Sequence, residues 1–255
     1  MKIIVCCKAV PGVVHEAKVA SDGKSLQYQG EFFSMNECDE AALEEAVALK
    51  RAHGGEITVV TMGPLAAQEI LYLGLSKGAD RAVRIDAQTQ DSQCAGVVLA
   101  AAFKKLEYDV VLSGAQSRDT LSGQAGIAVA VRLGIPFAYA VVEIQLTSGG
   151  ALRVRKELGG GRYADMELSL PALLCVQTGI RPLTYVPPAR TMRARQQPVR
   201  SFSLADLGLE ADALIPRGYR ILDVFPPERT SRVEFFSGNP QEVAANLLAR
   251  IKEAR

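Results

Sequence analysis

A cluster of polar side chains leads into the first long helical repeat of the sequence. The stretch SMNECDE, residues 34–40, runs directly into AALEEAVALK, whose apolar positions repeat at helical spacing. Asn36 is expected to cap the backbone donors of the first turn, and Asp39 and Glu40 favour the positive end of the helix dipole. These residues predict a helix start with polar groups that can bind a ligand, and they do not form a catalytic motif.

A second candidate binding stretch is SGAQSRDTLSGQAG, residues 113–126, between an apolar run and a helical repeat. It places Ser122, Gly123 and Gln124 at a helix N-terminus, where backbone N–H groups and the helix dipole favour a phosphate. The loop contains no lysine, so it suits a nucleotide that is held in place better than phosphoryl transfer. The alternative is an ordinary capped helix, with Ser122 as the cap and Gly123 in a tight turn.

Standard catalytic motifs are missing from the sequence. It has no G-x-S-x-G, no H-E-x-x-H, no Walker A lysine motif and no G-x-G-x-x-G after the first apolar run. His15 and His53 lie in polar stretches and are expected to be solvated, and the glycines at 159–161 are expected to form a turn. The five cysteines have no C-x-x-C or zinc spacing, which predicts reduced, mostly buried thiols and no metal site. A binder or carrier is therefore favoured over a hydrolase.

Composition narrows the class of protein further. The chain has 255 residues and is 48% hydrophobic, enough for one sizeable α/β domain, alone or with a long appendage. Its 29 basic and 28 acidic residues nearly cancel, so no global field attracts nucleic acid or an acidic membrane. No apolar run approaches the ~20 residues of a membrane span, and the N-terminus lacks the pattern of a signal peptide. We therefore expect a cytoplasmic protein without membrane insertion.

Apolar runs alternate with helical repeats over the first ~135 residues, which predicts βαβ units and a mostly parallel sheet. In such sheets ligands bind beyond the carboxyl ends of the strands, and the polar start of the first helix falls at that same edge. We expect strands at 2–8, 56–63, 81–85 and 109–114, and helices at about 36–53, 66–77, 92–106 and 123–133.

Beyond residue 138 the pattern changes to β-rich segments broken by glycines, which predicts hairpin strands that extend the sheet. Past Pro182 the chain is rich in Pro and Arg, which favours an extended arm, and a final helix is expected from about Pro240 to Ala254. We therefore divide the chain into an α/β domain with a β-extension, residues 1–182, and an arm with a terminal helix, residues 183–255.

Seven segments of the sequence form a specific set when they are taken together in this order: KAVPG (8–12), SMNECDEAALEEAVALK (34–50), VVTMGP (59–64), LSKGADRAVRI (75–85), DVVLSGAQSRD (109–119), ELSLPALLCVQTGIRPLTY (167–185) and TMRAR (191–195). Together they resemble the small (beta) subunit of an electron-transfer flavoprotein. The resemblance covers nearly the whole chain and is weakest beyond about Arg200.

The resemblance implies an α/β fold with a doubly wound, adenine-nucleotide-binding, Rossmann-like sheet, a β-hairpin extension and an extended C-terminal arm. It also implies a heterodimer in which FAD lies mainly on the large (alpha) subunit, while the small subunit holds AMP, or a second FAD in electron-bifurcating members. The nucleotide pocket that it implies comprises Cys6, Lys8, Asn36, Glu37, Cys38, Asp39, Met62, Gln116, Asp119, Thr120, Ser122, Gly123, Gln124 and Ala125.

The sequence departs from the family pattern at three places, one of which is the loop after Gln116, a few residues shorter than the common form. Glu37 and Cys38 replace a usual Pro-Phe pair beside the nucleotide, and Pro187-Pro188 stands near the leucine anchor of the partner-recognition loop. The family implies an electron carrier that accepts electrons from a flavin dehydrogenase and passes them to a membrane or soluble acceptor, such as a quinone oxidoreductase. Recognition of acyl-CoA dehydrogenases stays open, and another flavin dehydrogenase is an alternative donor.

Other interpretations remain open from the sequence. One is an electron-bifurcating subunit whose own FAD receives hydride from NADH, and another is a stand-alone adenine-nucleotide-binding sensor. Glu157 is either a carboxylate toward the flavin interface or a solvated strand residue. The basic cluster of the arm either clasps the large subunit or keeps the arm soluble; it comprises Arg190, Arg193, Arg195 and Arg200.

Overall fold

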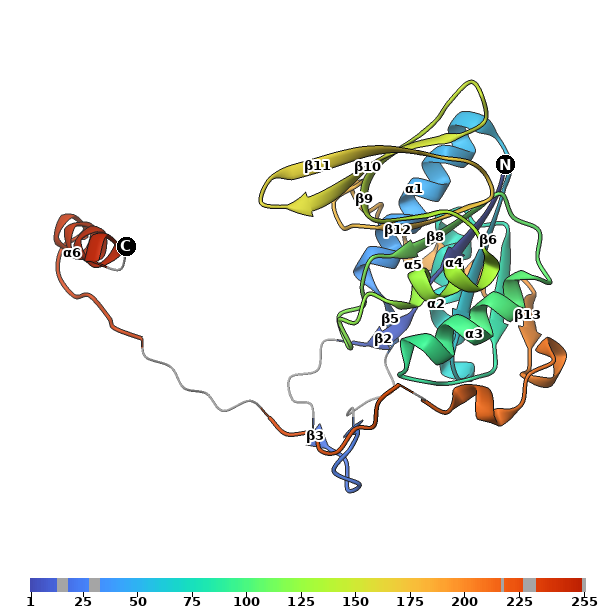
Figure 1. Ribbon diagram of the computed structural model, residues 1–255, viewed down its shortest axis with the longest axis horizontal. Helices are drawn as coiled ribbons and strands as arrows, with labels where there is room; N and C mark the ends of the chain where they lie inside the picture. Colours follow the sequence, from blue (N-terminus) through green and yellow to red (C-terminus); the bar gives the residue numbers. More distant parts are fainter. Residues whose placement is uncertain (13–17, 28–32, 217, 227–232, 254–255) are drawn as a thin grey trace.

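A nine-stranded sheet dominates the computed structural model, which describes residues 1–12, 18–27, 33–216, 218–226 and 233–253 (Figure 1). The strand order is β11-β10-β9-β12-β8-β1-β6-β7-β13. Neighbouring strands along the part of this order that runs β9-β12-β8-β1-β6-β7-β13 pair in parallel, whereas β9–β10 and β10–β11 are antiparallel. The strands are β1 (Lys2–Cys6), β6 (Glu56–Met62), β7 (Arg81–Ile85), β8 (Val110–Gly114), β9 (Phe137–Leu146), β10 (Leu152–Gly159), β11 (Arg162–Leu168), β12 (Ala172–Val176) and β13 (Val199–Phe202).

The helices cover both faces of the sheet and bury two separate apolar cores. On one face, α1 and α2 pack Leu43 and Leu71 against the strands, together with α5. On the other face, α3 and α4 contribute Phe103 and Val129. Each fully buried side chain of this size stabilises the fold by roughly 1.5–3 kcal/mol, and the two layers confirm the doubly wound α/β class. The helices are α1 (Glu37–His53), α2 (Glu69–Lys77), α3 (Ser92–Phe103), α4 (Ala125–Leu133), α5 (Pro188–Ala194) and α6 (Pro240–Glu253).

Shorter elements connect this framework. Two small antiparallel pairs lie near the N-terminus, and three 3₁₀ turns follow β6 and β13. They are β2 (Ala9–Pro11) with β5 (Phe33–Met35), β3 (Lys18–Val19) with β4 (Leu26–Gln27), η1 (Leu65–Gln68), η2 (Ala205–Leu207) and η3 (Ala211–Leu214).

The β-rich segment forms the expected hairpin extension at one end of the sheet. β10 pairs antiparallel with β9 on one side and with β11 on the other. The triple glycine lies where β10 turns into β11, and all three residues have positive φ, 81° at Gly159, 61° at Gly160 and 72° at Gly161. Only glycine adopts such a run without strain, so this segment is a turn, as expected.

The chain after residue 182 returns to the sheet before it leaves. β13 pairs in parallel with β7 and buries Phe202, although its sequence lies in the Pro- and Arg-rich stretch expected to be extended. β13 forms a strand although its local composition does not favour one, because the backbone N–H and C=O groups at the free edge of β7 can pair with it. The part of the chain proposed as an arm thus begins with α5 and β13, which contact the α/β domain.

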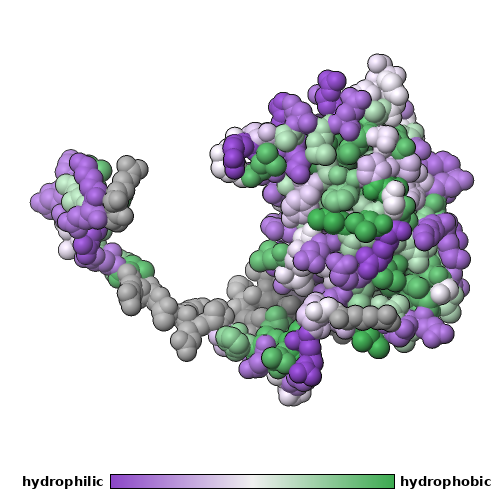
Figure 2. Space-filling model, in the orientation of Figure 1, coloured by the Kyte–Doolittle hydropathy of each residue, from purple (hydrophilic) through white to green (hydrophobic). Residues whose placement is uncertain are grey.

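The last described segment stands apart from the sheet. In Figure 1, α6 lies well away from the other helices, and its side chains are mostly exposed. Arg250 forms ion pairs with Glu234 at 3.1 Å and Glu253 at 3.0 Å, both within this last described segment. Apolar residues also gather on the arm beside this helix (Figure 2). Within the described ranges, no helix combines the length and the apolar character needed to cross a membrane.

Candidate functional site

A cleft opens where the sheet reverses its winding direction. β1 is followed by β6 and β7 on one side, whereas β8 and β12 lie on its other side. Open α/β sheets bind ligands at such a switch point, beyond the carboxyl ends of the strands. The cleft has a volume of about 330 Å³ and is lined by Lys8 after β1, Met62 at the end of β6 and Gly114 at the end of β8. The strand ends identified from the sequence therefore meet in one cavity.

Asp39 joins the two strand ends that flank this cleft. Its Oδ2 accepts a hydrogen bond from the Lys8 amide at 2.8 Å, and its Oδ1 accepts one from the Gly114 amide at 2.7 Å. The approach requires a glycine at 114, because an added Cβ would lie 2.4 Å from Asp39 Oδ1. Burial raises the pKa of Asp39 to about 6, against the opposing effect of the Lys8 and Gly114 amides. Asp39 thus brackets β1 and β8 from the start of α1.

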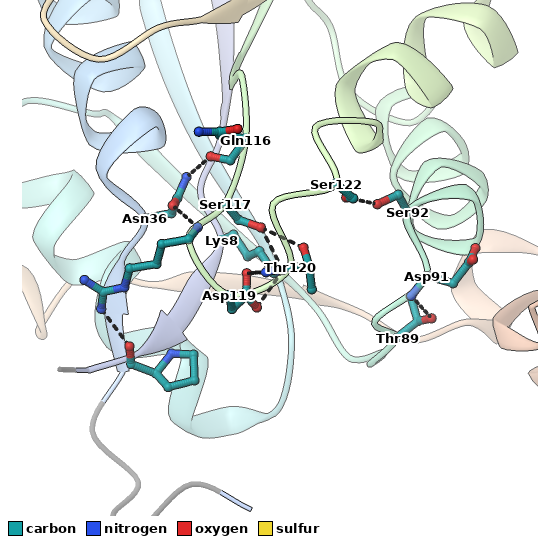
Figure 3. Close-up of polar contacts among 12 residues, drawn as sticks. Lys8, Asn36, Thr89, Asp91, Ser92, Gln116, Ser117, Asp119, Thr120 and Ser122 are labelled. Carbon is teal, nitrogen blue, oxygen red and sulfur yellow. Dashed lines mark hydrogen bonds and ion pairs between the residues drawn. The ribbon is translucent and has the colours of Figure 1, made fainter. Parts of the chain in front are cut away.

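Lys8 is the one cation among the described residues that line the cleft, and it is already paired. Its Nζ lies 2.8 Å from the Asp119 carboxylate and 3.2 Å from Ser117 Oγ (Figure 3). Burial alone would raise the pKa of Asp119, but the hydrogen bonds from Lys8 and Ser117 lower it below its usual range. The Thr120 amide also donates to Asp119, at 2.9 Å. These contacts fold the loop after β8 over the end of β1.

The side chain of Asn36 hydrogen-bonds to the same loop from the other side. It was expected from the sequence to cap α1, and that expectation is wrong. It occupies the N-cap position of α1, yet its side chain makes no capping hydrogen bond. Instead Nδ2 donates to the Gln116 carbonyl at 2.8 Å, and Oδ1 accepts from the Arg118 amide at 3.2 Å (Figure 3). The loop offers Asn36 both a donor and an acceptor, whereas the helix offers only donors. Arg118 extends the clasp, since its guanidinium donates to the Pro11 carbonyl at 2.6 Å.

The N-terminus of α4 faces the cleft without a side-chain cap. Its N-cap residue is Gln124, whose side chain makes no capping hydrogen bond. Ser122, the expected alternative cap, instead has its Oγ 2.6 Å from Ser92 Oγ at the start of α3 (Figure 3). The first N–H groups of a helix have no acceptor within it, and Ala125 and Gly126 of α4 line the cleft. These free donors fit a phosphate.

A turn at Gly123 shapes the part of the cleft beside the N-terminus of α4. Gly123 has a φ of 61°, and an added Cβ would lie 2.7 Å from the Tyr139 hydroxyl and 3.1 Å from the Ala115 carbonyl oxygen. A larger residue would be strained and would also push the loop out of position. Apolar side chains also line the cleft, among them Val60, Met62 and Leu99, and they suit a flat base.

Twelve of the fourteen residues implied by the resemblance line this cleft. Two do not. Glu37 is exposed, 3.6 Å from the Arg118 guanidinium, and Cys38 is buried with its Sγ 3.9 Å from Gln177 Oε1. The twelve are Cys6, Lys8, Asn36, Asp39, Met62, Gln116, Asp119, Thr120, Ser122, Gly123, Gln124 and Ala125.

One wall of the cleft was not predicted from the sequence. The loop after β7 contributes Gln88, Thr89 and Gln90, and Ser92 follows at the start of α3. Asp91 caps α3, since its Oδ1 accepts from the Cys94 amide at 2.7 Å. The signal was available, because this loop follows the carboxyl end of a parallel strand, the same position that identified the other walls.

Residues with open interpretations lie outside the cleft. His53 is exposed at the end of α1, and Glu157 is half-buried on β10. The four arginines of the basic cluster are exposed, with Arg195 2.6 Å from Glu69 and Arg200 stacked 4.4 Å from the Phe202 ring centre. His15 lies outside the described residues.

Comparison with known proteins agrees with this architecture. The family model described as "Electron transfer flavoprotein domain" matches residues 26–207. The chain is 33% identical to the electron transfer flavoprotein subunit beta of Methylophilus methylotrophus, over 99% of this chain and 98% of that protein. It is 31% identical to the caffeyl-CoA reductase-Etf complex subunit CarD of Acetobacterium woodii, with 99% and 98% covered. It is 28% identical to the human electron transfer flavoprotein subunit beta, with 99% and 97% covered.

Proposed function

The chain belongs to the electron transfer flavoprotein beta-subunit family, and from this premise we propose that it binds AMP, or the adenosine part of FAD, as the small subunit of an electron-carrying heterodimer. The observation that carries the proposal is the uncapped N-terminus of α4, which faces the switch-point cleft beside the one lysine of its described lining.

The phosphate of the nucleotide would lie at the start of α4. Backbone N–H groups of Gln124, Ala125 and Gly126 supply neutral donors there, and the helix dipole adds a partial positive charge. Lys8 is neutralised by Asp119, so this part of the cleft carries little net charge. A monophosphate is held by such a site, whereas phosphoryl transfer needs cations on the transferred group. The site therefore suits a nucleotide with a positional role.

The adenosine would lie between polar and apolar walls. Val60, Met62 and Leu99 provide surface for the base, and the side chains of Ser92 and Gln90 come from the opposite loop. The loop that Asn36 and Arg118 fasten closes the end of β8 over the ligand. No side chain needs to act as an acid or base here, because the nucleotide is held and not converted.

A flavin bound with the large subunit would supply the redox chemistry, which is the cofactor's own. The protein contributes position and electrostatic environment. The arm, residues 183–255, is proposed to clasp the large (alpha) subunit, since its described part exposes large apolar side chains, with Phe225 73% and Phe235 89% exposed. The donor is proposed to be a flavin dehydrogenase and the acceptor a quinone oxidoreductase or a soluble carrier.

A bifurcating subunit with its own FAD is the second candidate. Leu26, Phe33 and Pro64 also line the same cleft and offer an apolar surface to a flat ring. The two candidates differ in the nucleotide that the complex retains. One FAD with one AMP supports the simple carrier, whereas two FAD without AMP supports bifurcation with NADH as the hydride donor.

The test is to co-express the chain with a large subunit encoded nearby, denature the purified complex and count the released nucleotides. Ser122→Asp places a negative charge where the phosphate would lie, and we expect it to lower nucleotide content about tenfold or more. Ser148→Asp, at the exposed turn between β9 and β10, makes the same charge change far from the cleft and should leave the content unchanged. Equal nucleotide content in both variants would refute the assignment of the phosphate to α4.

A stand-alone sensor makes a different prediction. It would form no flavin-containing complex and would retain ATP on this chain alone. That result would overturn the proposed function and leave the cleft as the site of a different adenine nucleotide.

A further inference from the structure

The carboxyl end of β6 forms one wall of the nucleotide cleft through Met62, Gly63 and Pro64. Both backbone polar groups of Gly63 are bound by β7. The Gly63 amide donates to the Ile85 carbonyl at 3.0 Å, and the Gly63 carbonyl accepts from Nη1 of Arg84 at 2.9 Å. The position of this wall therefore depends on β7 and on one arginine side chain outside the cleft lining.

The turn at Gly63 is packed closely against the next element. A Cβ added at Gly63 would lie 2.9 Å from the Cβ of Ala67 in η1. Ala67 is itself 1% exposed and lines the cleft. A displacement of the Gly63 carbonyl would therefore move both of these lining residues.

Arg84 also contacts the arm, at strand β13 on the outer edge of the sheet (Figure 1). Its Nη2 donates to Ser201 Oγ at 3.3 Å, and its Nη1 lies 2.8 Å from the Asp86 carboxylate. The Asp86 amide donates to the Phe202 carbonyl at 2.8 Å, so the end of β7 is bound to β13 by its backbone as well. One guanidinium thus links the arm to the wall of the cleft across a single strand.

The stability of the sheet does not explain a guanidinium at this position. Arg84 is 8% exposed, and its neighbours on β7 are apolar: Ala82, Val83 and Ile85. A buried ion pair adds little stability compared with a well-packed apolar side chain of similar size, because both charges lose their hydration. Arg84 Nε is buried and has no hydrogen-bond partner within the part of the chain that the structure describes, so some of this cost is uncompensated. Besides Asp86, the groups that the guanidinium binds lie on the cleft wall and on the arm.

We propose that Arg84 is a positioning residue for the nucleotide. It holds the β6 wall of the cleft through the Gly63 carbonyl, and β13 of the arm holds Arg84 through Ser201. Residues behind a binding site fix the groups that line it, and a lining that shifts binds its ligand less tightly. The inference rests on the proposed function, because it concerns the ligand of that same cleft. It makes the arm part of the support of the site.

The test measures nucleotide release from the purified heterodimer. The complex is loaded with radiolabelled AMP and chased with excess unlabelled AMP; a complex that retains FAD in the cleft is followed by the fluorescence of released FAD. Arg84→Met keeps a long side chain and removes every donor, so release should be about three- to tenfold faster. Arg81→Met is the matched control, because Arg81 lies at the other end of β7, outside the cleft lining, with its side chain 70% exposed. It should release the nucleotide at the wild-type rate.

A double-mutant cycle tests the link to the arm. Ser201→Ala removes the bond between Arg84 and β13 and should speed release about twofold. In the Arg84→Met background, the same substitution should change the release rate by less than about 1.3-fold, because the guanidinium through which it acts is gone.

A stability control separates positioning from a general loss of structure. Ile57→Val removes one methylene from a fully buried side chain on β6, at the end of the strand away from the cleft. It should lower the unfolding temperature of the complex and leave the release rate unchanged.

Three outcomes would overturn the inference while leaving the proposed function intact. They are release from Arg84→Met at the wild-type rate, an effect of Ser201→Ala that does not depend on Arg84, and an acceleration by Ile57→Val as large as that by Arg84→Met. A wild-type complex that holds no adenine nucleotide would overturn both the inference and the proposed function, so the two failures are distinguishable.

Discussion

The buried carboxylate of Asp39 should make the stability of the chain depend on pH in a direction opposite to that of most acids. Its pKa is 3.8 in the unfolded reference and about 6 in the folded chain, because burial disfavours the charge. A carboxyl with a raised folded pKa contributes stability that is present below the unfolded pKa and is lost as pH rises through the folded pKa. Linkage gives a loss of about 2 kcal/mol between pH 4 and pH 7 for this one group.

Substitution of Asp39 by asparagine isolates this contribution. The variant has nearly the same shape and no titratable proton, so the other carboxyls cancel in the difference from wild type. Both oxygens of Asp39 accept from amides, and the asparagine can satisfy only one of them, which costs about 1–3 kcal/mol at any pH. On top of that constant loss, the free energy of unfolding of Asp39→Asn relative to wild type should rise by about 2 kcal/mol from pH 4 to pH 7.

The assay is urea unfolding followed by far-ultraviolet circular dichroism at several pH values. Asp165→Asn is a control of opposite sign, because the hydrogen bond from Arg155 lowers the pKa of the exposed Asp165. That variant should lose stability relative to wild type at neutral pH and approach it in acid. The difference in the free energy of unfolding between Asp39→Asn and wild type should therefore rise with pH. A difference that stays constant, or that falls as pH rises, would refute the claim that burial raises the pKa of Asp39.

Three further changes test the packing around the cleft. Gly114→Ala brings a Cβ within 2.9 Å of the Asp39 backbone nitrogen, so urea unfolding should show a loss of about 1–3 kcal/mol, whereas Gly149→Ala in an open turn should be nearly neutral. Lys77→Met removes a cation whose side chain is 2% exposed and which lies 2.9 Å from Glu40, and the uncompensated acids should cost about 3–5 kcal/mol; a much smaller effect would mean that water reaches the cluster. Asn36→Ser keeps a good helix cap but cannot reach the Gln116 carbonyl, so it should lose as much stability as Asn36→Ala, about 1–3 kcal/mol; rescue by serine would restore the capping interpretation.

The parallel core was predictable because its signals are local. β1, β6 and β8 are short apolar runs that are covered on both faces, so nearly every residue had to be apolar. Strand ends in a parallel sheet share one edge, so the polar residues after them could be placed together without coordinates. The same logic would have found the loop at Gln88–Ser92 had it been applied to β7.

Other features depend on contacts that no local pattern encodes. β13 reads VRSF, and it becomes a strand because β7 offers an edge and Arg84 of β7 donates to Ser201 Oγ at 3.3 Å. Asn36 and Ser122 both have the residue type of a helix cap, but each side chain instead hydrogen-bonds to a group distant in sequence, Asn36 to the loop after β8 and Ser122 to Ser92 at the start of α3. A cap motif therefore predicts where a helix begins more reliably than it predicts what the side chain binds.

The cysteine thiols around the cleft are expected to take no part in the redox chemistry proposed for a chain of this family. Cys6 lines the cavity, and Cys175 is buried close by, on β12. Burial raises the pKa of Cys175 to about 12, with the Asp39 carboxylate adding to the effect, and it raises the pKa of Cys6 in the same direction. The thiolate is the reactive form of cysteine, so these groups stay protonated and inert beside a site proposed to hold a redox protein's nucleotide. Asp39 therefore has two effects on the site. Its carboxylate joins β1 to β8 through two hydrogen bonds, and it also disfavours ionisation of the neighbouring thiols.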